Sequence, residues 1–360
     1  MTKSDGEFAH ENIAAECRFG QPVRRLEDER LLTGRGRYVS DIHLPGMAQA
    51  RMLRSPYAAG RLRRLDVSNA LKAPGVLSVL TGSDLIKEDF GNIRPLARLK
   101  RADGSDNFVP PYGMLAIDEV RHVGEIIAMV VAENVLQADA ALELIELEIE
   151  PIPSVTDIVQ ATASDALAVW PEEPTNICFV ERLGDAARSD LSFAQAAHIV
   201  EETFVISRVA ASPMETRSAI GIHEPVDNSY TLYAGLQTPH IVRNEIASQL
   251  LGIAPDKLRI ISPDVGGGFG LKASVQRELG LVLWAARGIG QPVRWVADRS
   301  ESFLGDHHAR DNISHVALAL DTDAKFLALR LRAKTNLGAY IDTFGLSVTV
   351  GNLGGLSGPY

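Results

Sequence analysis

The stretch SPDVGGGFGLKAS, residues 262–274, places glycine at four of five consecutive positions and keeps one aromatic residue, Phe269, among them. The preceding DKLRIISPDV has the apolar pattern of a strand. After the loop, the spacing predicts a helix from Lys272 with one core-facing stripe, formed by Val275, Leu279, Val282 and Ala286. A strand, a turn without side chains and a helix N-terminus would direct backbone N–H groups and the helix dipole towards an anion.

Two well-known phosphate-binding loops do not match this stretch. A Walker A loop ends in Gly-Lys followed by Ser or Thr, whereas here Leu271 precedes Lys272 and Ala273 follows it. The dinucleotide fingerprint Gly-x-Gly-x-x-Gly, counted from Gly266, would need a glycine at position 271. Two interpretations stay open at this point: a structural turn in which Phe269 fills the core, or a shelf on which a cofactor lies.

The composition sets limits on the class of protein. The chain has 360 residues, 46% of them hydrophobic, which is enough to bury a sizeable core. A formal net charge of −10 opposes binding to a polyphosphate backbone, so nucleic acid is not expected as a partner. The N-terminal segment MTKSDGEFAHENIAAECRFG is polar, and the longest apolar run, which starts at Ile126, is too short to span a bilayer. We therefore expect a cytoplasmic protein with no membrane span.

Cysteine is scarce in this chain. Cys17 and Cys178 are too far apart in sequence to have metal-ligand spacing, and we expect both to be free thiols. An iron–sulfur cluster needs about four thiolates. If the protein does redox chemistry, its electrons must leave through another subunit or a bound cofactor.

Strand and helix patterns alternate along the chain and predict an α+β protein with two domains. In the first domain, MAQARMLRSPY, GVLSVLTGSDL and GEIIAMVVAEN have strand patterns, and VLQADAALELIELEIE begins as a helix and ends as a strand. Prolines interrupt the patterns between positions 151 and 174, so we place a linker at 154–180, between domains at 20–153 and 181–360. The second domain shows strands at IVEETFVISRVA and SYTLYAGL, a helix at PHIVRNEIASQLLG and a hairpin at HVALALDTDAKFLALRLRAKTNLGAY.

Gln237 is a candidate site residue because it stands at the end of the predicted strand SYTLYAGL, just before a Thr-Pro break. A carboxamide in this position can reach the cleft of the glycine loop and offers both a donor and an acceptor. The alternative is an ordinary surface or capping glutamine.

Several separated motifs, in the right order, resemble one protein family. LQTPHIVRNEIASQLLGI, VGGGFGLKASVQRE, VRWVADRSESFLGDHHARD and TNLGAY are similar to the molybdopterin-binding large subunit of the xanthine dehydrogenase, aldehyde oxidase and carbon monoxide dehydrogenase family. GRGRYVSDIHLPGMAQARMLRSPYAAGRL and GEIIAMVVAENVLQADAALELIELEIEPIP resemble the hammerhead α/β domain that opens such subunits. The resemblance extends from about residue 20 to the last residue.

This resemblance implies a molybdenum hydroxylase that oxidises an aldehyde, carbon monoxide or an aromatic N-heterocycle with water as the oxygen source. By the resemblance, the metal would be held by a pterin dithiolene and not by protein ligands, and in bacterial members of the family this pterin is often the cytosine dinucleotide form. By the resemblance, Gln237 would hydrogen-bond a molybdenum oxo ligand, and Gly267, Gly268, Phe269 and Gly270 would line the cofactor site. Electrons would pass to FAD-binding and 2Fe-2S subunits, and the assembly would be a dimer of heterotrimers.

The sequence also departs from the family pattern. Purine-hydroxylating members carry an acidic residue where Ala273 stands, which makes xanthine a poor substrate candidate. The family's general base, a glutamate near the C-terminus, matches no residue here and is expected beyond Tyr360, so we expect the chain alone to be inactive. The alternative is a truncated remnant, or half of a split subunit, that acts as a binding module. His307, His308 and Asp311 could suggest a metal cluster, but we favour polar side chains near the cofactor.

Overall fold

The structure is a computed structural model that describes residues 20, 25–101 and 103–354, the last five by their backbone only. Cys17 and the polar N-terminal segment lie outside the described residues. The chain divides into two compact units, residues 1–37 and 38–360. Within the described part of the first unit there is one short helix, α1 (Asp28–Leu32). The sheets and the candidate site belong to the second unit.

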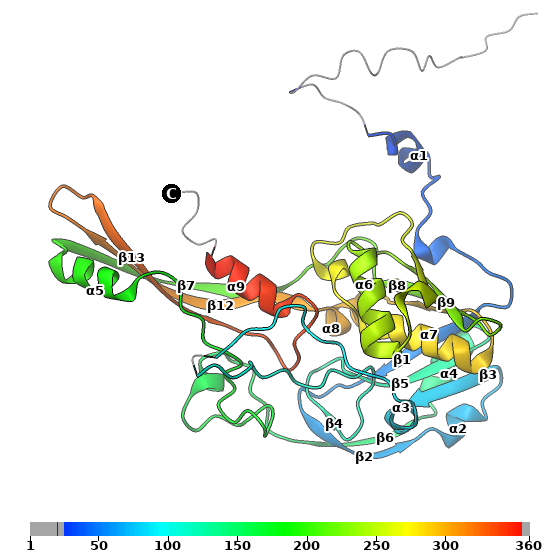
Figure 1. Ribbon diagram of the computed structural model, residues 1–360. Coiled ribbons are helices and arrows are strands. Elements are labelled where there is room, and N and C mark those ends of the chain that lie inside the picture. Colours follow the sequence, from blue (N-terminus) through cyan, green and yellow to red (C-terminus); the bar gives the residue numbers. More distant parts are fainter. Residues whose placement is uncertain (1–19, 21–24, 102, 355–360) are drawn as a thin grey trace, which may run out of the picture. The chain divides into compact units, whose positions relative to one another are not determined.

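The second unit contains thirteen strands in its described residues (Figure 1). They are β1 (Ala48–Arg54), β2 (Gly60–Asp66), β3 (Val76–Thr81), β4 (Glu119–Val120), β5 (Ile126–Ala132), β6 (Glu146–Pro151), β7 (His198–Ala210), β8 (Ser218–Glu224), β9 (Ser229–Ala234), β10 (Leu258–Ile261), β11 (Val293–Val296), β12 (His308–Leu320) and β13 (Phe326–Thr335). The α-helices are α2 (Ser68–Leu71), α3 (Gly82–Lys87), α4 (Val135–Leu142), α5 (Ala186–Gln195), α6 (Pro239–Glu245), α7 (Arg277–Ile289), α8 (Arg299–Gly305) and α9 (Gly345–Gly354). Shorter helical turns are η1 (Val39–Asp41), η2 (Gln160–Thr162), η3 (Ile246–Leu251), η4 (Pro255–Lys257) and η5 (Leu271–Ala273).

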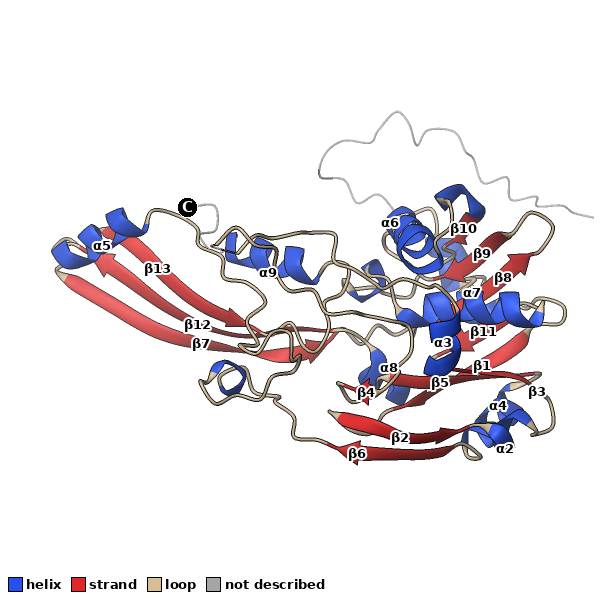
Figure 2. Ribbon diagram, turned by 60° about the horizontal axis from the view of Figure 1, so that its bottom comes forward, coloured by secondary structure: helices blue, strands red, loops and turns tan. Residues whose placement is uncertain are grey.

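One mixed sheet of seven strands, in the order β10-β9-β8-β11-β1-β5-β3, organises this unit (Figure 2). Strands from both sides of the predicted linker take part in it. The join is the parallel pair β1–β11, in which Ala48 lies opposite Val293 and Ala50 opposite Trp295. The segments before and after residues 154–180 therefore share backbone hydrogen bonds and a common core.

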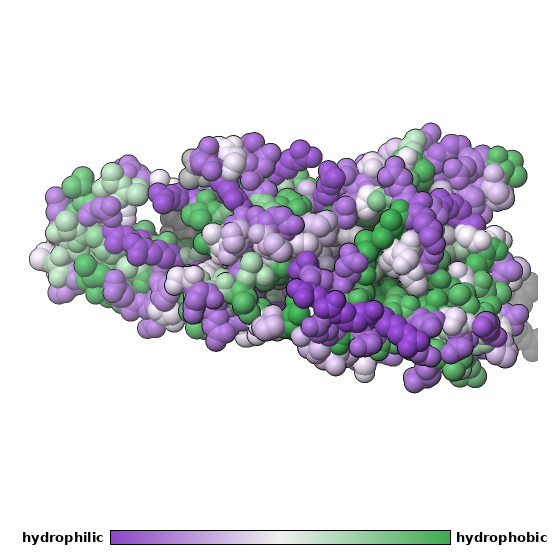
Figure 3. Space-filling model, turned by 90° about the horizontal axis from the view of Figure 1, so that it is seen from below, coloured by the Kyte–Doolittle hydropathy of each residue, from purple (hydrophilic) through white to green (hydrophobic). Residues whose placement is uncertain are grey.

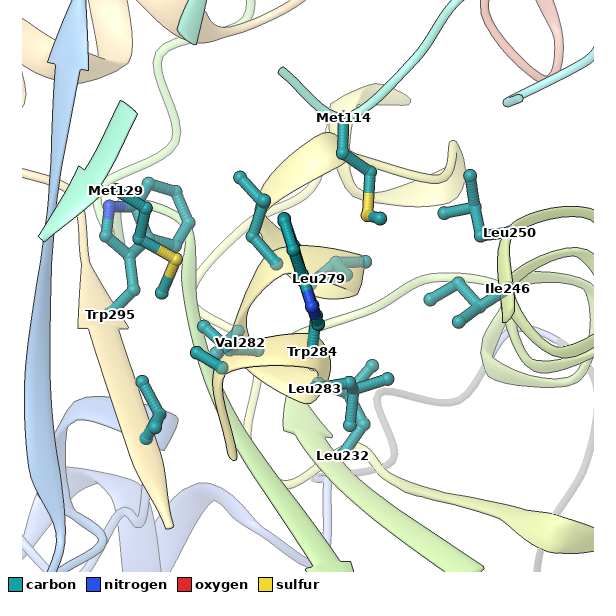
Figure 4. Close-up of a cluster of buried hydrophobic side chains, with 14 of the residues drawn as sticks. Met114, Met129, Leu232, Ile246, Leu250, Leu279, Val282, Leu283, Trp284 and Trp295 are labelled. Carbon is teal, nitrogen blue, oxygen red and sulfur yellow. The ribbon is translucent and has the colours of Figure 1, made fainter. Parts of the chain in front are cut away.

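Helix α7 packs on this sheet and forms the centre of the main core (Figure 4). The four predicted stripe residues are buried, but so is every residue from Arg277 to Ala286. In Figure 4, Leu279, Val282 and Trp284 of α7 lie among side chains from β5, β9, β11 and η3. The helix approaches the sheet so closely that a Cβ on Gly221 in β8 would lie 2.5 Å from the Val282 carbonyl carbon. A side-chain-free residue is required at this contact.

Two further sheets have three strands each, β4-β2-β6 and β13-β12-β7. The predicted hairpin is confirmed: β12 and β13 pair antiparallel around a turn in which the Asp321 carboxylate accepts hydrogen bonds from two backbone N–H groups. The predicted helix at residues 239–252 is confirmed as α6 followed by the π-helical turn η3, which ends at Gly252 in the left-handed conformation.

Candidate functional site

Three loops meet at one edge of the seven-stranded sheet because of the order of its strands. Strands β9 and β10 run parallel, so their C-terminal ends lie at the same edge. Strand β8 runs antiparallel to β9, which brings the start of β8 to that edge as well. The glycine loop after β10, Gln237 after β9 and Glu215 before β8 are thereby brought together.

The structure places Gln237 directly against the glycine loop. Its Oε1 accepts a hydrogen bond from the backbone N–H of Gly270 at 2.9 Å, and its own backbone N–H donates to the Lys272 carbonyl at 2.9 Å. A Cβ on Gly268 would lie 2.5 Å from the Gln237 Cδ and Oε1 atoms. The missing side chain at Gly268 therefore makes room for this carboxamide.

Glu215, which was not predicted as a site residue, holds the same loop from another direction. Its Oε2 accepts hydrogen bonds from Gly266 N and from Lys272 Nζ, both at 2.7 Å. The backbones also join, since Glu215 N donates to the Gly266 carbonyl at 3.1 Å. A Cβ on Gly266 would lie 2.5 Å from the Glu215 Cβ, so this glycine too is explained by a neighbouring side chain.

The Glu215–Lys272 pair is shielded from water. The Lys272 side chain is 2% exposed and that of Glu215 11%. Arg299 supports the segment by donating to the carbonyls of Pro213 and Met214 at 2.7 and 3.0 Å. The glutamate stands in the segment SPMETR, but its pairing with Lys272 joins residues 57 positions apart, and no local pattern marks such a pairing.

The rest of the loop faces outward. Phe269 is 76% exposed and Met214 95%, so Phe269 does not fill the core in this structure. Phe269 has a φ of +51°, a left-handed conformation that is uncommon for a non-glycine residue. Gly270 has a φ of +89° and open space where a Cβ would stand. Among the described residues, the backbone N–H groups of Gly267, Gly268 and Phe269 have no protein acceptor.

The predicted helix start at Lys272 was wrong. Residues Leu271–Ala273 form the single turn η5, and α7 begins at Arg277. Val275 N instead donates to the Thr343 hydroxyl at 3.0 Å, and the Ser274 hydroxyl donates to Asp342 at 2.8 Å, which hold the intervening backbone out of the helix. The glycine loop is therefore not at the N-terminus of α7, and the dipole of that helix does not act on a group bound at the loop. The donors available to such a group are the backbone N–H groups of the loop itself.

A buried network of charges lies at the base of the site. Glu278, in the first turn of α7, accepts hydrogen bonds from Arg54 at 2.7 Å and from Arg217 at 2.7 and 3.1 Å. Burial alone would raise the pKa of the Glu278 carboxyl, but the two guanidinium groups outweigh it and hold the pKa well below its usual range. Arg217 also donates to Asp306 at 2.6 Å. Because Arg217 is two residues after Glu215, this network fixes the segment that carries Glu215.

The three residues that could have suggested a metal cluster lie in separate environments. His307 Nδ1 is 3.0 Å from Asp342 Oδ2, and its Nε2 is 3.0 Å from the Tyr112 hydroxyl. Asp311 accepts a hydrogen bond from Asn336 at 2.8 Å, and His308 is 3.4 Å from the Phe303 carbonyl. Within the residues that the structure describes, no group of three or more His, Cys, Asp or Glu could hold a metal ion.

Comparison with known proteins agrees with this fold. The family model of an aldehyde oxidase and xanthine dehydrogenase a/b hammerhead domain matches residues 33–153, and that of a molybdopterin cofactor-binding domain matches residues 169–360. These define the class: a hammerhead domain joined to a molybdopterin cofactor-binding domain. The resemblance and the α+β fold predicted from the sequence are both confirmed.

Individual relatives identify the family. The chain is 36% identical to the nicotine 6-hydroxylase large subunit of Paenarthrobacter nicotinovorans, over 89% of this chain and 38% of that one. It is 32% identical to the carbon monoxide dehydrogenase large chain of Afipia carboxidovorans, over 89% and 40%. The crystal structure of quinoline 2-oxidoreductase from Pseudomonas putida 86 aligns with a TM-score of 0.80 and 38% identity, over 90% and 40%. The chain therefore belongs to the molybdopterin-binding large-subunit family of molybdenum hydroxylases, and it spans about 40% of the length of these relatives.

The residues at the loop fit a molybdopterin group. The exposed Gln237 carboxamide uses its Oε1 within the protein, and among the described residues its Nε2 donates to no acceptor. Beside it lie the three N–H groups without a protein acceptor and the exposed ring of Phe269. Donors of this kind next to an exposed aromatic ring suit a planar group with anionic oxygen atoms. In the part of the chain that the structure describes, no helix has the length and apolarity needed to cross a membrane.

Proposed function

We propose that this chain forms the part of a molybdenum hydroxylase large subunit that positions the cofactor through its glycine loop and Gln237. The observation that carries the proposal is the convergence of Gln237 and Glu215 on residues 266–270. Both side chains fix the loop, and they leave three backbone N–H groups and one carboxamide NH₂ without protein acceptors in the described residues.

When bound, a molybdenum centre would supply the two-electron oxidation of the substrate with oxygen from water. The residues of this chain would bind and orient it. Gln237 would donate from Nε2 to an anionic oxygen while Gly270 N holds the carboxamide by its Oε1. Gly267, Gly268 and Phe269 would donate from their backbone, and the Phe269 ring would exclude water from one side. We propose the pterin to be the cytosine dinucleotide form on the resemblance alone.

We propose an aromatic N-heterocycle as the substrate class. Nicotine 6-hydroxylase and quinoline 2-oxidoreductase, both similar to this chain at more than a third identity, are named for substrates with such rings. The carbon monoxide dehydrogenase large chain is also similar to this chain, over the same 89% of its length. Ala273 leaves no carboxylate at the position that purine hydroxylases use. FAD-binding and 2Fe-2S partner subunits, an assembly of two heterotrimers and a cytoplasmic location also belong to this proposal.

Cofactor retention tests the proposal on the chain itself. The 360-residue chain would be produced in a host that makes molybdopterin, and molybdenum and pterin would be measured per folded chain. We expect Gln237→Ala to lower retention with an unchanged circular dichroism spectrum. Gln195→Ala is the matched control, because Gln195 is an exposed residue at the end of α5. Equal retention in both variants would contradict the assignment of Gln237.

A second candidate is a non-catalytic half of a split subunit that acts as a binding module. The observation that favours it is the sheet β13-β12-β7, whose strand β7 is exposed over almost its whole length. A chain that retains no pterin in the experiment above, but forms a defined complex, would support this candidate over the first. Dye-linked assays with N-heterocycles and aldehydes would complete the comparison, since we expect the chain alone to show no turnover.

A further inference from the structure

In the three-stranded sheet β13-β12-β7, the two edge strands are β13 and β7. Helix α5 packs on one face of this sheet at β13, where Arg330 binds Asp190 at 2.6 Å and its guanidinium lies 4.0 Å from the centre of the Phe193 ring. In the antiparallel register, Ala317 of β12 stands opposite both Arg330 and Glu201. Residues directly opposite each other share a face. Odd-numbered residues of β7 therefore lie on the α5 side, and even-numbered residues lie on the other.

Strand β7 is an unprotected edge strand. It has thirteen residues, it ends the sheet, and every residue from His198 to Val209 is exposed. Apolar residues make up much of it, with Phe204 52%, Val205 73% and Ile206 45% exposed. Figure 3 shows apolar side chains in green at this end of the unit, on the left. A long edge without proline or a bulge presents a row of unpaired N–H and C=O groups to another strand.

The charges on β7 are arranged around its centre. Glu202 and Arg208 stand on the face away from α5 and lie three residues before and three after Val205. Their interactions within the chain are weak. Arg208 Nε is 4.0 Å from Asp311 Oδ2, and in the part of the chain that the structure describes Glu202 accepts a hydrogen bond only from the neighbouring Thr203 N–H. Two such strands placed antiparallel, with Val205 opposite Val205, set each Glu202 opposite an Arg208.

We propose that β7 pairs antiparallel with β7 of a second copy of this chain, with Val205 on the two-fold axis. In this register Phe204 lies opposite Ile206, and both ion pairs form. A shift by two residues in one direction would place Glu202 opposite Ile206 and Arg208 opposite Val200, which loses both pairs. The two-fold symmetry closes the assembly as a dimer with one continuous sheet, three strands from each copy.

This pairing does not rest on the proposed function, because the edge of β7 is exposed whether or not a cofactor is bound. Cross-strand pairs are worth about 0.2–1 kcal/mol each, and like charges directly opposite are destabilising. Reversing one charge would replace two attractive pairs by two repulsive ones. A weakening of the dimer dissociation constant by at least about fivefold follows from these values.

Charge reversal tests the pairing. Sedimentation velocity over a range of concentrations would measure the dissociation constant of the 360-residue chain. We expect a monomer–dimer equilibrium, weakening of at least about fivefold in Glu202→Arg and in Arg208→Glu, and recovery in the double variant. Glu201→Arg is the matched control, because Glu201 lies on the α5 side and opposite Val209 in this register. Circular dichroism would show that each variant is folded.

A cysteine at the axis tests the register. Val205→Cys, treated with a mild oxidant that accepts the two electrons of disulfide formation, should give a covalent dimer beyond the background of the unsubstituted chain. Thr203→Cys should not, because it would lie opposite Ser207. A monomer at every concentration, equal disruption by Glu201→Arg, or no recovery in the double charge reversal would overturn the proposal. A ladder of larger oligomers would overturn it too, since it would indicate head-to-tail pairing of β7 with β13.

Discussion

The space above Gly268 is occupied by Gln237: a Cβ on this glycine would lie 2.5 Å from the Gln237 Oε1 atom and 2.7 Å from its Cγ. The glycine and the glutamine are therefore one structural unit, although thirty residues separate them. The loop is free of side chains at 266 and 268 because Glu215 and Gln237 take those positions, and not only because a ligand needs the space.

A double-mutant cycle at Gly268 and Gln237 should show this coupling. Gly268→Ala should displace the Gln237 side chain and break its bond to Gly270 N, at a cost of about 1 kcal/mol, because Gly268 has no positive φ that would add strain. In a Gln237→Ala background the same substitution should cost much less, since no carboxamide is then displaced. Urea unfolding of the four proteins measures the coupling.

Gly290→Ala is the control for that cycle, because a Cβ on this residue at the end of α7 meets no atom within 4 Å but the φ of +69° makes alanine strained. Its cost should be the same with or without Gln237. Additive effects at Gly268 and Gln237 would contradict the steric explanation.

Lys272 should be essential to the stability of the loop. In Lys272→Met, the Glu215 carboxylate would lose its charged partner inside the protein, and the free energy of unfolding should fall by about 3–5 kcal/mol. Adding Glu215→Gln should recover much of the loss, because the neutral amide still offers an oxygen to Gly266 N and carries no buried charge. Chemical denaturation would check both. A Glu215→Gln/Lys272→Met protein no more stable than Lys272→Met would rule out a charge effect.

Local patterns were sufficient for most of the fold. The apolar run at Ile126 predicted the fully buried β5, and the spacing of Leu279 and Val282 predicted α7. Strand β8 was not predicted, because Gly221 interrupts the strand pattern of SAIGIHE; that glycine is required by the contact with α7. The helix start was misplaced because Asp342 and Thr343 bind the Ser274 hydroxyl and the Val275 backbone N–H, and no local pattern reports such a contact.

Local patterns also marked part of the candidate site, but not the residues that act through long-range contacts. Gln237 and the glycines stand beside breaks in regular structure, so their sequence neighbours marked them. Glu215 acts through Lys272 and Gly266, which lie far along the chain, so only the order of β8, β9 and β10 brings them together. The roles of the cofactor-lining residues stay predictions until they are tested.

Limited proteolysis should cut the chain at residues 154–180 without separating its two parts. This segment contains one short turn, η2, and no strand, so its backbone should open at low cost. The fragments should co-elute and unfold in one transition, because β1 and β11 belong to one sheet. Size-exclusion chromatography and mass spectrometry of the nicked protein would show this. Fragments that separate in buffer would mean that the shared sheet is not the main connection.

His307 should make the stability of the protein depend on alkaline pH. Burial alone would lower the pKa of its imidazole, but Tyr112 and Asp342 outweigh burial and raise the pKa to about 10. A group whose pKa is higher in the folded state stabilises the protein fully below its unfolded pKa of about 6.5, and this contribution is lost as pH rises through the folded value. The free energy of unfolding of the native chain should therefore fall between about pH 6.5 and 10 relative to His307→Gln, by about 1.4 kcal/mol for each unit of pKa difference at most.

Urea unfolding of both proteins across this range tests the sign, and NMR titration of the His307 ring tests the pKa directly. His308→Gln is the matched control, because the His308 side chain is exposed and lies 3.4 Å from a backbone carbonyl and not beside a carboxylate. A difference between native chain and His307→Gln that is constant with pH would mean that His307 is neutral in the folded protein.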